Sequence, residues 1–132
     1  MPPQRGSKGK TAIELGSAFR GSVERLSHGQ KKRISEFVRL KQRGQPVPGV
    51  DKVSGQRPDG TLFEPFLQRR ICHYHLSERK RDPILIYQDL QERGRIRLIV
   101  VCDHSRIFAG QEGAFMAEFD RDLDSPEGAS GR

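Results

Sequence analysis

"RIRLIVVC", residues 95–102, is the stretch that decides the fold. From Ile96 to Cys102 it is nearly all apolar, without the alternation of apolar and polar residues that marks a strand with one solvated face. The pattern predicts a strand at the centre of a sheet, buried on both sides.

Further strands are predicted before this one. "DPILIYQDL" contains a short apolar strand over residues 84–87, and "QERG" turns the chain towards Ile96. "LFEPFLQRRICHYHL" indicates an earlier strand over residues 66–76, interrupted at Pro65. "TAIEL" near the N-terminus indicates a fourth short strand.

Two helices are predicted on the N-terminal side. "SAFRGSVERL" places Phe19, Val23 and Leu26 on one helical face, with Ser17 as the capping residue. "HGQ" is expected to break the chain before a second, very basic helix over residues 30–43. Together they predict an antiparallel helical hairpin.

The element order predicts an α+β domain over residues 11–119. The N-terminal helical hairpin would pack on one face of a small antiparallel β-sheet. A short last helix would place Phe115, Met116 and Phe119 on the sheet. We expect a disordered basic tail at 1–10 and a disordered acidic tail at 120–132.

The charge is unevenly distributed. The chain of 132 residues carries a formal net charge of +7, and residues 1–50 hold 11 Lys and Arg against 3 Asp and Glu. This excess is typical of a protein with a polyanionic partner, most simply a nucleic acid, and equally of a protein whose helix faces are rich in lysine and arginine. No run is long enough to span a membrane, no apolar secretory segment follows the basic start, and two cysteines make no disulfide framework. We therefore expect a cytoplasmic protein.

Two short clusters, "CHYHL" at 72–76 and "CDHSRIF" at 102–108, hold three of the four histidines and both cysteines. Strand alternation puts His73 and His75 on one face. A metal site could join them with His104 or a cysteine, but the spacing is not a closed zinc pattern and neighbouring arginines disfavour a dication. In another interpretation the histidines are structural residues, and we favour this interpretation for His28.

The same residues suit acid–base chemistry on RNA. His73, His75, Asp82 and His104 could exchange protons, and the 2′-hydroxyl of RNA is its own nucleophile, so no metal or other cofactor is required. The crowded phosphate would need positive charge. Cations close to the clusters in sequence are Arg69, Arg70, Arg79, Lys80, Arg81 and Arg106.

These motifs resemble a family of bacterial proteins. "CHYHLSERKRDPILIYQ" is similar to the stretch in YafQ-like toxins that runs Cys-His-Ile, then Asp, then an Ile/Leu-rich strand ending in Tyr. "LQRRICHYHL" resembles Arg-x-x-His-x-His-Leu of the YafO-like toxins, and "HSRIF" resembles His-Ser-Asp-Leu-Phe of the YafQ-like group. With the predicted layout, residues 12–110 resemble the RelE/ParE superfamily of type II toxins.

The resemblance implies a RelE-like fold and a ribosome-dependent endoribonuclease that cleaves mRNA and is inhibited by a cognate antitoxin. It implies catalytic roles for His104, for Asp82 and for either His73 or His75, while Phe108 would position the RNA. The basic second helix would lie against ribosomal RNA. Together with the cations near the clusters, this makes seven residues candidates for RNA and phosphate binding: Lys31, Lys32, Arg33, Arg69, Arg70, Arg81 and Arg106.

The sequence also departs from the family pattern. "SERKR" is inserted before Asp82, Arg106 stands where the family often has Asp, and residues 45–71 contain no counterpart of the upstream histidine of YafQ-like toxins. The superfamily also includes gyrase-directed toxins and members that only bind an antitoxin or nucleic acid. A non-catalytic protein of the same fold is therefore an alternative, and a small metalloprotein that uses His73, His75 and His104 is another.

Overall fold

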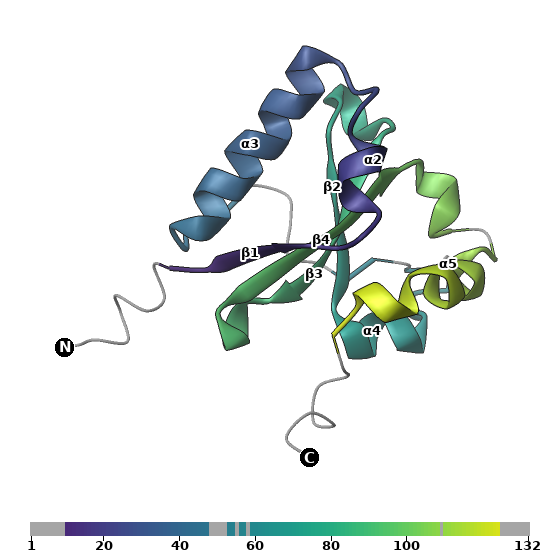
Figure 1. Ribbon diagram of the computed structural model, residues 1–132. Helices are drawn as coiled ribbons and strands as arrows, with labels where there is room; N and C mark the ends of the chain where they lie inside the picture. Colours follow the sequence, from purple (N-terminus) through teal and green to yellow (C-terminus); the bar gives the residue numbers. More distant parts are fainter. Residues whose placement is uncertain (1–9, 48–52, 55, 58, 109, 125–132) are drawn as a thin grey trace.

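The computed structural model describes residues 10–47, 53–54, 56–57, 59–108 and 110–124 (Figure 1). The predicted N-terminal tail, apart from Lys10, lies outside these residues. Within the described part of the chain, no helix combines the length and the apolar character that a membrane span requires.

A mixed four-stranded sheet forms the centre of the molecule. Its strands are β1 (Ala12–Leu15), β4 (Arg95–Cys102), β3 (Ile84–Leu90) and β2 (Ile71–His75), in the spatial order β1-β4-β3-β2. The prediction that residues 95–102 form an inner strand is confirmed, because β4 pairs on both edges. The predicted α+β class is also confirmed.

The predicted all-antiparallel sheet is wrong in one strand. The meander β2-β3-β4 is antiparallel, but β1 runs parallel to β4. Strand periodicity carries no information on direction. Strands β3 and β4 are joined by the short helical turn η2 (Gln91–Arg93) and Gly94 at φ 77°, whereas β1 reaches the sheet through a long crossover, which permits parallel pairing.

The predicted strand over residues 66–76 is wrong in its first half. The segment forms helix α4 (Glu64–Arg69), and β2 begins only at Ile71. Pro65 occupies the first turn of α4, where its missing N–H and fixed φ are harmless, so it starts a helix rather than interrupting a strand. Arg70, at φ 55°, then ends the helix.

The predicted helical hairpin is not confirmed, because its first helix is a single turn, α2 (Phe19–Ser22). Ser17 does not cap it. The backbone N–H and the hydroxyl of Ser17 instead donate hydrogen bonds to the carboxylate of Asp122, at 3.1 and 3.0 Å.

The second predicted helix is α3 (His28–Gln42), and it starts earlier than expected. Ser27 and Gln30 form a capping box, in which each side chain accepts a hydrogen bond from the other residue's backbone N–H. His28 therefore lies in the first turn of a helix and not in the predicted break.

Helices cover both faces of the sheet, where the sequence predicted one (Figure 1). On one face, Ile34 and Phe37 of α3 pack on Tyr87 and Leu98. On the other, Phe66 of α4 and Phe115 of α5 (Glu112–Phe119) belong to a second buried cluster. The prediction that Phe115, Met116 and Phe119 pack on the sheet is confirmed.

Residues 120–124, expected in the acidic tail, lie on the sheet domain. Asp120–Asp122 form the helical turn η4, and Leu123 is buried. Asp124 forms ion pairs with Arg93 of the β3–β4 turn and with Arg95, the first residue of β4. The acidic residues of this segment thus neutralise arginines of the sheet. Residues 125–132 lie outside the described part.

The capping box gives a first prediction. Ser27→Ala removes the acceptor for the Gln30 N–H, and we expect the free energy of unfolding to fall by about 1 kcal/mol in urea denaturation. Ser35→Ala, an exposed position within the same helix, is the matched control and should not destabilise the protein. Equal losses in the two variants would contradict a capping role for Ser27.

Candidate active site

Three segments of the meander meet at one end of the sheet. In the strand pairing His75 lies opposite Ile84, and Ile84 lies opposite Cys102, so the end of β2, the start of β3 and the end of β4 are neighbours. Asp82 precedes β3. His104 opens the helical turn η3 (His104–Arg106) directly after β4.

The inserted residues "SERKR" do not keep Asp82 away from the histidines. They form a loop containing the helical turn η1 (Glu78–Lys80), and the backbone N–H of Leu76 donates to the Pro83 carbonyl at 3.1 Å. This bond closes the loop at its base, so Asp82 emerges beside the end of β4.

Asp82 holds His104 in a fixed orientation. One carboxylate oxygen, Oδ1, accepts from the backbone N–H of His104 at 2.7 Å and from its ring Nδ1 at 2.6 Å. With its proton on Nδ1, a neutral His104 ring presents the Nε2 lone pair to its neighbours. That atom lies 3.1 Å from Nε2 of His75, within hydrogen-bond distance.

His73 lies behind this pair. Its ring centroid is 4.9 Å from that of His75 and 5.4 Å from that of His104, so the predicted shared face of His73 and His75 is confirmed. Its Nδ1 lies 2.6 Å from the hydroxyl oxygen of Ser54, which is buried.

Ser54 was not identified from the sequence. It comes from the loop before α4, where its backbone N–H donates to the Ile71 carbonyl at 2.7 Å and Val53 forms an isolated bridge with Cys72. A single serine in a loop rich in Pro and Gly carries no local signal, because only this tertiary pairing brings it to His73.

Phe108 completes the cluster. The turn η3 brings its ring back onto His104, where the two rings stack with centroids 5.8 Å apart and an interplanar angle of 25°. The ring of His73 lies edge-on to Phe108 at 6.0 Å. All five residues predicted to be catalytic therefore lie together.

Burial changes the protonation of His73. Loss of hydration, with smaller contributions from the charges of His75 and His104, lowers the pKa of His73 to about 4. At neutral pH His73 is therefore uncharged.

His75 and Asp82 also have lowered pKa values. Loss of hydration lowers the pKa of His75, and the charges of His104, Lys80 and Arg33 act in the same direction, while Asp82 opposes them. Burial of Asp82 disfavours its ionisation, but hydrogen bonds from His104 outweigh this effect and hold the pKa of Asp82 below its ordinary value. At neutral pH an anionic Asp82 thus lies beside a neutral His75.

A basic cleft adjoins the cluster. It has a volume of about 730 Å³ and runs between the first turn of α3 and the β2–β3 loop, with Asp82 in its lining. Three arginines line it, Arg33, Arg79 and Arg81, together with Gln30 and a second acidic residue, Glu78. Asp82 is the residue that the cleft lining shares with the histidine cluster.

Arg33 also anchors helix α3 to strand β2. Its guanidinium donates two hydrogen bonds to the backbone oxygen of His75, at 3.0 and 3.3 Å, and lies over the ring of Tyr74. It thus ties α3 to the strand that carries the histidines.

The other predicted phosphate-binding cations divide into two groups. Lys31, Lys32 and Arg81 are exposed, the first two on α3 and the third in the cleft. The remaining three form ion pairs within the protein: Arg69 with Asp120, Arg70 with Asp89 and Arg106 with Glu118.

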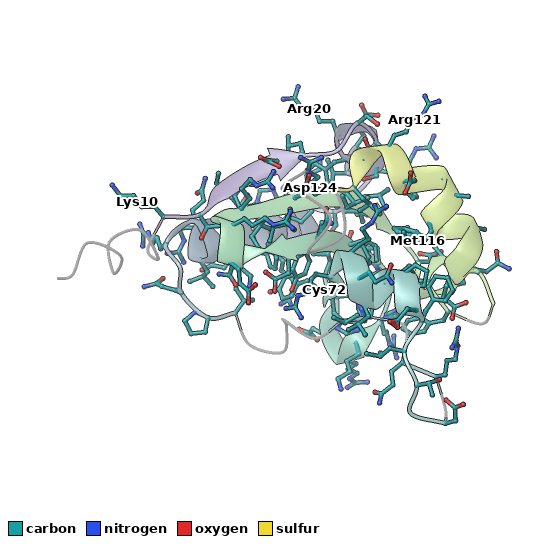
Figure 2. All side chains as sticks on the ribbon, turned by 90° about the horizontal axis from the view of Figure 1, so that it is seen from below. Lys10, Arg20, Cys72, Met116, Arg121 and Asp124 are labelled. Atoms are coloured by element: carbon teal, nitrogen blue, oxygen red, sulfur yellow. The ribbon has the colours of Figure 1, made fainter. Side chains whose placement is uncertain are left out.

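Neither cysteine has the properties of a nucleophile. Cys72 is fully buried in the interior (Figure 2), and burial raises the pKa of Cys102 to about 12. Their prediction as small core residues is confirmed for Cys72, and Cys102 packs half-buried against the second core cluster.

The three histidines are also the residues that could hold a metal. One ring nitrogen from each of His73, His75 and His104 lies within 4.8 Å of the others.

No family model, curated protein or solved structure matches the chain.

The buried His73 gives a pH prediction. Its pKa is about 4 in the folded protein and about 6.5 in the unfolded chain, so as the pH falls from 6.5 to 4 only the unfolded chain gains the proton. From His73 alone, the free energy of unfolding should fall by about 1.4 kcal/mol per pH unit in this window and level off below pH 4.

Urea denaturation at several pH values, with a chelator present, measures this slope. His73→Gln should flatten it, whereas His28→Gln, at an exposed histidine of α3, should leave it unchanged. An identical slope in His73→Gln and the unmodified protein would contradict the assignment.

Proposed function

We propose that the chain is a metal-independent endoribonuclease of the toxin type, which cleaves mRNA on the ribosome and is inhibited by a cognate antitoxin. The observation that carries the proposal is the contact of His75, His104 and Asp82 at the end of the meander. The resemblance to RelE/ParE toxins named the same residues from sequence motifs. The agreement between the sequence motifs and the contacts of these three residues supports the proposal.

The residues supply the two proton transfers of RNA cleavage. Neutral His75 would accept the proton of the 2′-hydroxyl, whose oxygen attacks the adjacent phosphorus. Protonated His104, oriented by Asp82, would donate a proton to the 5′-oxygen as the P–O5′ bond breaks. The products are a 2′,3′-cyclic phosphate and a 5′-hydroxyl.

The contact between the two histidines suits recovery after each reaction. One turnover leaves His75 with an extra proton and His104 short of one. When the product departs, the 3.1 Å approach of their Nε2 atoms would allow that proton to pass back directly. A bound phosphate would separate the two rings in the meantime.

Substrate binding would use the cleft and the stacking face. Arg33, Arg79 and Arg81 in the cleft supply positive charge for the sugar–phosphate chain. Phe108 offers an aromatic surface for a base beside the histidines. Arg69, Arg70 and Arg106 play no part in this proposal, since each forms an ion pair with a carboxylate of the protein.

The catalytic assignment is tested with purified protein, ribosomes and mRNA. His75→Ala and His104→Ala should each lower the cleavage rate about 100-fold or more, because each removes a proton-transfer group. His28→Ala, the histidine outside the cluster, should cleave normally. Circular dichroism confirms that each variant is folded.

Growth of bacteria expressing each variant without an antitoxin provides a second readout. Loss of toxicity in the double variant His75→Ala/His104→Ala, with the fold intact, supports the enzyme. Full toxicity in that variant would instead indicate the non-catalytic alternative. Intact mRNA after incubation with the unmodified protein and ribosomes would refute cleavage.

The exposed lysines of α3 should act in ribosome binding. We expect Lys31→Gln/Lys32→Gln to weaken ribosome association and to reduce its log–log salt dependence by about 1 to 2, since each phosphate contact contributes about 0.7 to 0.9. Arg20→Gln/Arg121→Gln removes the same charge from side chains that point outwards elsewhere (Figure 2) and is the control. Equal losses in both double variants would contradict a specific role for α3.

A further inference from the structure

Two of the three clustered imidazoles already have the spacing of metal ligands. Nε2 of His75 and Nε2 of His104 are 3.1 Å apart. Around a tetrahedral zinc ion with Zn–N bonds of 2.0 to 2.1 Å, two nitrogens lie about 3.3 Å apart. A ring nitrogen of His73 completes the group within 4.8 Å, so a modest side-chain movement would bring three nitrogens around one ion.

The outer contacts of these rings favour the same arrangement. Metal-binding histidines commonly donate their second ring N–H to a carboxylate or another oxygen, which fixes the ring and raises its basicity. Here Nδ1 of His104 lies 2.6 Å from the Asp82 carboxylate, and Nδ1 of His73 lies 2.6 Å from the Ser54 hydroxyl. Both rings therefore have Nε2 available for a shared ion.

Two of the arginines that counted against a metal in the sequence form ion pairs within the protein, while Arg79 and Arg81 line the adjoining cleft. Arg69 and Arg70 pair with Asp120 and Asp89. Arg33 donates to the backbone of His75, and its guanidinium lies over Tyr74, whose side chain points to the opposite face of β2 from the imidazoles. The carboxylate of Asp82 contacts His104 directly and opposes the positive charges of Lys80 and Arg33 that act on His75.

We propose that His73, His75 and His104 bind one divalent transition-metal ion of the zinc type, and that this ion blocks acid–base cleavage at the same residues. Three imidazoles leave a fourth position on the ion for water. The ion would occupy the Nε2 lone pairs of His75 and His104, through which the proton transfers of RNA cleavage would run. Binding itself is independent of the proposed function, and only the blocking of cleavage rests on it.

Metal binding is tested on the full chain without an affinity tag. Zinc titration by calorimetry should give one site per chain, and Co²⁺ should give the visible absorption of a tetrahedral site. His75→Ala, His104→Ala and the triple variant that also carries His73→Ala should lose both signals, whereas His28→Ala should keep them. Asp82→Asn should weaken binding about 10-fold to 100-fold. Equal zinc affinity in the triple variant and the unmodified protein would overturn the site.

The blocking of cleavage is tested with ribosomes, mRNA and zinc at concentrations that span the measured affinity. The cleavage rate should fall in proportion to site occupancy and recover on addition of a chelator. A rate that rises with zinc would overturn this part. Absence of cleavage with and without zinc would refute the proposed function and the blocking together, while the titration still decides whether the metal site exists.

Discussion

The rest of the structure depends on the burial of β4. A strand that is apolar on both faces is stable only if both faces are covered and both edges are paired. Helix α3 covers one face, α4 and α5 cover the other, and β1 and β3 pair with its edges. The first and last strands of the chain consequently become neighbours, and the segments before and after β4 must close around it.

The site lies where this buried strand ends. Past Cys102 the chain leaves the sheet, and His104 is held by the loop that precedes β3 through the two hydrogen bonds to Asp82. His75 is the last residue of the edge strand β2, which is separated from β4 by β3. The pairing of the three meander strands therefore sets the separation of the polar groups at this end of the sheet.

The sequence predicted the apolar core of this arrangement well, because apolar runs and strand alternation are local signals. It predicted β4 as an inner strand and His73 and His75 on one face of their strand. It also predicted that His104 and Phe108 belong to the same site. It failed where local signals have two meanings. Pro65 can interrupt a strand or begin a helix, Ser17 can cap a helix or bind a distant carboxylate, and a strand pattern does not give direction. Ser54 had no signal at all.

The contact between Arg33 and β2 has a practical consequence for studying this protein. The guanidinium binds the main-chain oxygen of residue 75 and not its imidazole. Every amino acid at position 75 offers that same acceptor, so the anchorage of α3 to β2 does not depend on which side chain stands there. A substitution at this position alone therefore leaves the acceptor that joins the N-terminal half of α3 to the edge strand in place.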